Sequence, residues 1–239
     1  MNTWQKLRWL VLSGITEVIA EEPVNRLSQP TPSATPPPAP TTPPLSEAAA
    51  TTAIEAKTLS DLYAARAAFE GCPLKKTAGH TLNGRGAPTP QVLCLLEAPD
   101  TMDERDGRLL SGQAGALFDR MLAAIGLDLE TSAYVSTLIP WRPPGNRKPT
   151  ATEHALCRPF WEREIALLRP RILLLFGAGA AAAVLGISSL AKARGTWHTF
   201  AGIPTRVTIP PATLLNLPAQ KKQAWEDLQQ VQAKLAQPD

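Results

Sequence analysis

Residues 91–100 read QVLCLLEAPD, in which five apolar residues in a row are followed at once by a carboxylate, a proline and a second carboxylate. A short apolar run without polar alternation is typical of a strand that is buried on both faces of a sheet. The run RILLLF at residues 171–176 has the same character. We therefore expect strands at residues 91–96, 133–139, 171–176 and 203–209.

Segments of helical periodicity separate these strands. The amphipathic run QAGALFDRMLAAI is followed by Gly126, and Thr150 or Thr152 is the expected cap of a helix that ends at Leu168. The predicted helices span residues 59–69, 113–125, 152–168, 178–185 and 220–235. Because strands alternate with helices, we predict an α/β fold of three layers, α/β/α, around a four-stranded, mostly parallel central sheet.

The chain ahead of this domain divides into two parts. Eight of the 24 prolines lie in residues 29–44, QPTPSATPPPAPTTPP, which have no charge and no apolar residue except alanine, and such a segment cannot bury a core. Residues 4–20 place apolar side chains at helical spacing, which predicts an amphipathic helix docked on the main domain or on a protein partner. We expect three parts: an N-terminal helix (1–27), a disordered linker rich in Pro, Ala and Thr (28–57), and the α/β domain (58–239).

The composition favours a soluble, monomeric protein of the cytoplasm. Three cysteines at unrelated spacings give no disulfide framework, which is typical of a reducing compartment. No span reaches the roughly 20 apolar residues needed to cross a bilayer, and the apolar run at residues 9–12 is too short for a signal peptide. The formal net charge of +3 is compatible with a polyanionic partner such as DNA.

Ligands of parallel sheets bind beyond the carboxyl ends of the strands. The loops to search are therefore residues 97–112, 137–147, 177–179 and 210–216. The first loop is acidic and is able to activate water or bind a metal, or it is a solvated loop with acidic residues near a helix start. The run RPPGNR at residues 142–147 either shapes a pocket wall or holds phosphates. Gly177-Ala-Gly lacks the third glycine of a dinucleotide fingerprint, so a nucleotide cofactor is not expected.

Taken in order, these loops resemble the family-four uracil-DNA glycosylases. That family has a Gly-Glu-Ala-Pro-Gly loop, then Glu-Asp, an Asn before Cys-Arg-Pro-Pro-Gly-Asn-Arg, and His-Pro-Ala-x-Leu-Leu before a Lys-rich closing helix. The matching segments here are residues 71–78, 96–100, 103–104, 107–115, 137–147, 194–197 and 210–215. The resemblance covers roughly residues 59–235, and it implies a uracil-DNA glycosylase-like α/β domain with single- or double-stranded DNA as its partner.

The resemblance also implies a site that takes a base flipped out of DNA and hydrolyses its glycosidic bond. Glu97 is the retained carboxylate of the first loop, and Asp103 matches the acidic residue that orients water. We therefore expect Glu97 and Asp103 to be the catalytic residues. Asp100 stands where the family closes this loop with glycine, and its carboxylate is expected to repel an incoming phosphate.

Three further positions of the implied base pocket differ from the family. Leu110 stands at the position of a stacking Phe and lacks the π face. Thr137 replaces an Asn that reads the pyrimidine edge, and Pro210 replaces a His that stabilises the departing anion. The residues expected to form the pocket wall or contact DNA are Arg142, Asn146, Arg147, Arg194 and His198.

Members of the family commonly hold a [4Fe–4S] cluster on four thiolates. Cys72 and Cys157 stand at two of the matching positions, whereas Phe69 and Trp141 replace the other two. We therefore expect no cluster and no other cofactor or metal, with Cys72 and Cys157 as remnants of a cluster site.

Two functions remain open. In the first, the protein is a hydrolase of DNA base-excision repair that removes uracil or another damaged base. In the second, it is a catalytically inactive module that uses the glycosylase fold to bind DNA or a protein. Losing one oxyanion donor typically costs on the order of a hundred- to a thousandfold in rate, so weak or no uracil excision is expected. His80 and His154 are expected to have surface or packing roles.

Overall fold

The computed structural model describes residues 53 and 55–237. The predicted N-terminal helix (1–27) and residues 28–52 and 54 of the predicted linker lie outside the described residues. Among the described residues of the predicted linker, Ala53 and Ala56 are buried in a cluster with Leu62 and Phe160. The Ala56 carbonyl accepts hydrogen bonds from the guanidinium of Arg163, at 2.6 Å from Nη2. Packing of the domain therefore begins ahead of residue 58.

Among the described residues, the sheet has six strands in the order β1-β3-β2-β4-β6-β5. The four central strands are parallel: β2 (Val92–Leu96), β3 (Ala133–Thr137), β4 (Ile172–Phe176) and β6 (Ile203–Thr208). Every residue of β2, β3 and β4 is buried, as the apolar runs predict. The edge strands β1 (Arg85–Gly86) and β5 (His198–Phe200) are antiparallel to their neighbours. The predicted fold class is confirmed, and the predicted four strands are the centre of a larger sheet.

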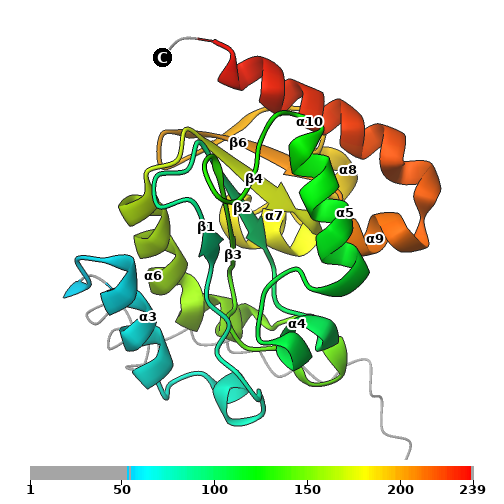
Figure 1. Ribbon diagram of the computed structural model, residues 1–239. Helices are drawn as coiled ribbons and strands as arrows, with labels where there is room; N and C mark the ends of the chain where they lie inside the picture. Colours follow the sequence, from blue (N-terminus) through cyan, green and yellow to red (C-terminus); the bar gives the residue numbers. More distant parts are fainter. Residues whose placement is uncertain (1–52, 54, 238–239) are drawn as a thin grey trace, which may run out of the picture. The chain divides into compact units, whose positions relative to one another are not determined.

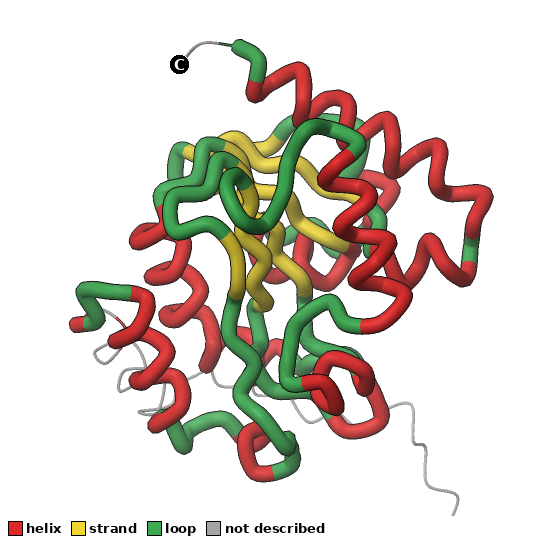
Figure 2. Tube along the Cα trace, viewed as in Figure 1, coloured by secondary structure: helices red, strands yellow, loops and turns green. Residues whose placement is uncertain are grey.

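Helices cover both faces of this sheet, which forms the central layer in Figure 2. One hydrophobic cluster joins the sheet to α6 (Ala151–Leu168) and α7 (Gly177–Leu185). A second cluster joins the opposite face to α5 (Gly112–Ala123) and α10 (Lys221–Leu235), which lie side by side in Figure 1. The three-layer arrangement predicted from the alternation of strands and helices is therefore confirmed.

The helix caps follow the expected chemistry. Thr150 caps α6 and forms a reciprocal capping box with Glu153, and Thr58 does the same with Asp61 for α3 (Leu59–Ala68). The helix α3 packs on α6 through Leu62 and Phe160. The long helices were predicted to within two residues at each end.

In the described part of the chain, three short α-helices were not predicted: α4 (Thr101–Asp106), α8 (Leu190–Ala193) and α9 (Pro211–Asn216). Helices of four to six residues show too little periodicity to be recognised from apolar spacing. The first of them lies inside the acidic segment that was expected to be a loop, directly after β2. Among the described helices, none is both long and apolar enough to span a bilayer.

Candidate active site

The acidic segment after β2 is built around a capping box. The Asp100 carboxylate accepts hydrogen bonds from the backbone N–H of Met102 (2.8 Å) and of Asp103 (2.9 Å), and thereby caps α4. In return, the Asp103 carboxylate accepts a hydrogen bond from the Asp100 N–H at 3.3 Å. The Asp100 carboxylate, which was expected to face incoming phosphate, therefore has a structural partner within its own loop.

Asp103 also connects α4 to the next helix. Its Oδ1 accepts a hydrogen bond at 2.8 Å from the N–H of Ser111, the residue that precedes α5. Only 4% of Asp103 is exposed. Burial raises the pKa of its carboxyl to about 6, against the opposing effect of the Ser111 N–H. A carboxyl with this pKa is able to exchange a proton near neutral pH.

Leu110 and Thr137 are both buried and engaged within the protein. Leu110 has a positive φ of 54° and lies in the hydrophobic cluster with Phe118. Its carbonyl oxygen would lie 1.9 Å from a Cβ atom on Gly115, so only glycine fits at that position. Thr137 is fully buried, and its hydroxyl donates to the Ile139 carbonyl at 3.0 Å. Both side chains are buried.

Pro210 lies at the end of β6, next to the start of α7. A Cβ atom on Gly177 would lie 3.0 Å from the Pro210 Cγ, and Gly177 has a φ of +92°. Pro210 is the N-cap residue of α9, and its ring has no polar atom that forms a capping hydrogen bond. The position that the resemblance gives to an anion-stabilising donor is therefore apolar, as the sequence indicates.

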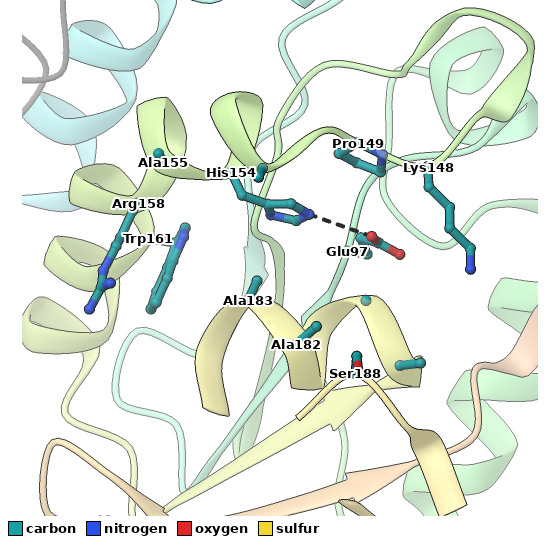
Figure 3. Close-up of a pocket in the computed structure, with 13 residues that line it drawn as sticks. Glu97, Lys148, Pro149, His154, Ala155, Arg158, Trp161, Ala182, Ala183 and Ser188 are labelled. Carbon is teal, nitrogen blue, oxygen red and sulfur yellow. Dashed lines mark ion pairs between the residues drawn. The ribbon is translucent and has the colours of Figure 1, made fainter. Parts of the chain in front are cut away.

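Glu97 lines a cavity of about 500 Å³ between α6 and α7. Figure 3 shows the Glu97 carboxylate pointing toward the imidazole of His154, which comes from the first turns of α6. The distance from Glu97 Oε1 to His154 Nε2 is 3.5 Å, and their side chains are 26% and 18% exposed. Lys148 stands at the same cavity, and Ala182 of α7 lies below the pair. Asp103 does not line this cavity, so the two predicted catalytic carboxylates face different surroundings.

Gly179 explains why α7 begins with the sequence Gly-Ala-Gly. A Cβ atom at Gly179 would lie 1.9 Å from the Cδ atom of Glu97. The glycine therefore leaves the space that the Glu97 side chain occupies. This close approach, rather than nucleotide binding, accounts for the second glycine of the motif.

The predicted contact residues fall into two groups. Arg142 and Asn146 hydrogen-bond each other at 3.1 Å, and Arg142 also pairs with Glu104. Arg147 forms a bidentate pair with Glu153, at 2.9 and 2.6 Å, and this guanidinium lowers the pKa of Glu153 to about 2. These three residues share the loop between β3 and α6.

Arg194 and His198 form the second group. Arg194 pairs with Asp227 at 2.7 Å and also bonds Gln223, both residues of α10. His198 lies on the edge strand β5, where its Nε2 is 2.8 Å from the Ala193 carbonyl. Neither residue lines the Glu97 cavity.

His154 is the residue that the sequence reasoning placed in a surface or packing role and that the structure puts beside Glu97. The signal was available in the cap at Thr150, because it puts His154 in the first turns of α6. A helix that follows a parallel strand begins at the carboxyl edge of the sheet, so its first turns face the ligand loops. Lys148, two residues ahead of that cap, was missed for the same reason.

The positions that the resemblance gives to cluster ligands lie together in one hydrophobic cluster. Cys72 and Cys157 are buried, and the hydrogen bond between their thiols lowers the pKa of Cys72 and raises that of Cys157. The rings of Phe69 and Trp141 pack beside each other, with centroids 6.5 Å apart. Two thiols and two aromatic rings do not provide the four thiolates that a [4Fe–4S] cluster needs. The donor set therefore does not fit the cluster.

Comparison with known proteins agrees with this architecture. A model of the uracil DNA glycosylase superfamily matches residues 83–229, more than half of the chain. The type-4 uracil-DNA glycosylase of Saccharolobus solfataricus is 28% identical, over 69% of this chain and 81% of its own length. That of Pyrobaculum aerophilum is 28% identical, over 66% of this chain and 84% of its own length. The chain belongs to the uracil DNA glycosylase superfamily.

Proposed function

We propose that this protein works in DNA base-excision repair as a uracil-DNA glycosylase-like protein that hydrolyses the N-glycosidic bond of uracil or another damaged base at a low rate. The observation that carries the proposal is that Glu97, directly after β2, presents its carboxylate to a cavity at the carboxyl edge of the sheet, and the low rate follows from the position of Asp103 outside that cavity. Glu97 faces the cavity beside His154, whereas Asp103 is buried between α4 and α5 and is outside that cavity.

Hydrolysis of a glycosidic bond requires a carboxylate that positions water and a donor that stabilises the departing base. Glu97 and Asp103 are the proposed catalytic residues, with Asp103 having the pKa near neutrality that suits proton exchange. At the position of the donor stands Pro210, which has no side-chain hydrogen to donate. The reaction is therefore expected to run slowly on uracil.

The loop of Arg142, Asn146 and Arg147 is the proposed DNA contact. Asn146 and Arg147 are exposed, and the adjacent Lys148 adds positive charge at the same edge of the sheet. Arg142 and Arg147 are paired with glutamates, which fixes the orientation of their guanidiniums. Phosphate contacts of this kind make affinity fall steeply with salt.

A second candidate is a non-catalytic module that binds DNA or a protein through the same fold. The observation in its favour is that the side-chain oxygens of Asp100, Asp103 and Thr137 already accept or donate hydrogen bonds within the protein. The two candidates differ in the effect of Glu97→Gln. In a slow glycosylase, Glu97→Gln abolishes the remaining uracil excision. In a non-catalytic binding module, the variant has the same excision signal and the same affinity for DNA as wild type.

We further propose that the protein folds and works without an iron–sulfur cluster. Phe69 and Trp141 stand at two positions that the resemblance gives to ligands, and the Trp141 indole donates to the Thr81 hydroxyl at 2.9 Å. The protein is proposed to act in the cytoplasm as a monomer.

The experiment that tests the proposed function is single-turnover excision from a uracil-containing oligonucleotide by the full chain. Pro210→His supplies a donor where charge develops on the base, and is expected to raise the rate on the order of a hundredfold. Pro218→His, at an exposed proline outside the site, is the matched control and is expected to leave the rate unchanged. An equal rate for wild type and Pro210→His would show that the missing donor does not limit the reaction.

A further inference from the structure

The cavity between α6 and α7 has features of a ligand site that uracil chemistry does not explain. Its volume of about 500 Å³ lies within the roughly 300–1,000 Å³ range of small-molecule sites. The floor and one wall are small apolar side chains of α7, among them Ala182 and Ala183, which Figure 3 shows below the Glu97–His154 pair. Flat apolar walls of this kind suit a planar ring.

Two polar atoms without partners lie behind the opposite wall. Within the described residues, His154 Nδ1 and Trp161 Nε1 are buried and find no hydrogen-bond partner. Both residues line the cavity, and Trp161 is only 2% exposed. Both atoms lie beneath the surface of the wall, out of reach of a ligand in the cavity, so the choice of ligand depends on Glu97 and Lys148.

Glu97 determines which edge such a ligand must present. A carboxylate only accepts hydrogen bonds, and its two oxygens match two adjacent N–H donors. Lys148 is exposed at the same cavity and only donates. The cavity therefore offers an acceptor pair and, beside it, a cationic donor.

We infer that this cavity binds a guanine base, with N1–H and the N2 amino group on Glu97 and the carbonyl O6 toward Lys148. Guanine is the nucleobase whose edge carries two adjacent N–H donors followed by a carbonyl acceptor. Uracil has one N–H between two carbonyl oxygens, and one of these would face the Glu97 carboxylate. The inference goes beyond the proposed function, because the ligand differs from the base that is excised slowly.

His154 and Gly179 hold the recognising carboxylate in place. His154 Nε2 lies 3.5 Å from Glu97 Oε1 and is a partner on one side. On the other side Gly179 has no side chain, which leaves room for the carboxylate. The charge of Lys148 also suits a phosphate at the mouth of the cavity, so the guanine comes either from a free nucleotide or from DNA.

The test measures equilibrium binding of guanosine, inosine and uridine to the full chain by calorimetry. Inosine lacks only the N2 amino group, so it would leave one Glu97 oxygen without its donor. We expect saturable binding of guanosine, at least about tenfold weaker binding of inosine, and still weaker binding of uridine. Equal affinities for guanosine and inosine, or no binding of guanosine at millimolar concentration, would overturn the inference.

Two variants separate recognition by the cavity from binding elsewhere. Glu97→Gln replaces one acceptor oxygen with an NH₂ group and is expected to weaken guanosine at least about tenfold. Ala182→Leu fills the floor of the cavity while Glu97 and His154 remain, and is expected to abolish binding. Glu226→Gln, at an exposed glutamate on α10, is the matched control and is expected to bind as wild type does. Retained binding in Ala182→Leu, with an unchanged melting temperature, would place the ligand outside this cavity and refute the inference.

Two further arms distinguish the sources of the guanine. Guanosine monophosphate is compared with an oligothymidine that contains a single guanine, each in wild type and in Lys148→Ala. Tighter binding of the monophosphate that depends on Lys148 identifies a free nucleotide. A guanine-dependent gain in oligonucleotide affinity that is lost in Ala182→Leu identifies a base of DNA. Fast uracil excision would contradict the proposed function and leave these binding results unaffected.

Discussion

Glu97 and Gly179 are in such close contact that a single added carbon atom at the glycine would lie 1.9 Å from the Cδ of the carboxylate. The first residue after β2 and the third residue of α7 therefore constrain each other, although 82 positions separate them in the sequence. The shape of the cavity depends on this contact, because any larger residue at position 179 would displace Glu97.

This contact predicts that the effect of Gly179→Ala on the stability of the protein changes sign with the residue at position 97. Alanine stabilises a helix interior by up to about 1 kcal/mol relative to glycine, so Gly179→Ala is expected to be stabilising when Glu97 is also alanine. With Glu97 present the same substitution is expected to be destabilising, and a double-mutant cycle should give a coupling of roughly 0.5–3 kcal/mol. Urea unfolding of the four proteins measures it, and purely additive effects would refute the contact.

Asp103 predicts a pH dependence of stability. Its pKa is raised to about 6 in the folded protein, against about 3.9 in an unfolded chain. Because the folded state favours the protonated form, this group's contribution to stability is fully present below about pH 4. It is lost as the pH rises toward 6, and the loss is on the order of 2–3 kcal/mol.

The variant Asp103→Asn removes this titration while keeping the shape of the side chain. Wild type should therefore lose stability relative to Asp103→Asn between pH 4 and pH 7, as measured by denaturant unfolding across that range. The opposite slope would mean that the hydrogen bonds from Ser111 and Asp100 outweigh burial, and that the pKa of Asp103 is lowered. A lowered pKa would remove Asp103 as a proton-exchanging group.

The long elements were predictable from the sequence because their signals are local. The apolar runs predicted the four central strands, and the two candidate caps Thr150 and Thr152 included Thr150, which caps α6 in the structure. The helix α4 was missed although its signal is present: Asp100-Thr-Met-Asp103 has the spacing of a capping box, which was instead interpreted as an acidic loop. Attention to that spacing would have predicted a structural role for both carboxylates.

The site was harder to predict, because it depends on contacts across the fold. Glu97 was expected at the carboxyl edge on the strength of its position after β2, and it lies there. His154 and Gly179 were not assigned to it, since their roles depend on how α6 and α7 turn toward that edge. The cap at Thr150 indicates that His154 lies near this edge, but no local pattern specifies which side of α6 faces Glu97.

A buried ion pair between α3 and α6 is expected to be required for the stability of the domain. Glu164 is fully buried and accepts hydrogen bonds from Arg66 (2.9 Å), Ser136 (2.8 Å) and Tyr63 (2.7 Å). Removing one partner of a buried pair typically costs about 3–5 kcal/mol, because the other charge is left uncompensated. Arg66→Met and Glu164→Gln are each expected to show this loss in thermal or urea unfolding.

The double variant distinguishes a true pair from two independent packing sites. Arg66→Met combined with Glu164→Gln leaves no unpaired charge, so its cost is expected to be well below the sum of the two single costs. Strictly additive losses would show that the two residues act separately.

The side chains at the matched cluster positions predict an iron-free protein. The full chain, purified aerobically or anaerobically, is expected to contain no stoichiometric iron and to show no absorbance band of a [4Fe–4S] cluster in the visible range. Metal analysis measures the iron content, and absorbance spectra detect any cluster band. Stoichiometric iron that is lost in Cys72→Ser would contradict the proposal and assign Cys72 a ligand role.

Uracil excision itself tests the central claim most directly. The measurement is the single-turnover rate on a uracil-containing single strand with the protein in excess, beside the type-4 uracil-DNA glycosylase of Saccharolobus solfataricus at one temperature. Because the chain lacks the donor at Pro210 and has buried the side chains at Leu110 and Thr137, we predict a rate at least about a hundredfold below that of the relative. A rate within tenfold of the relative would contradict the account, and would mean that Glu97 and its neighbours suffice for efficient excision.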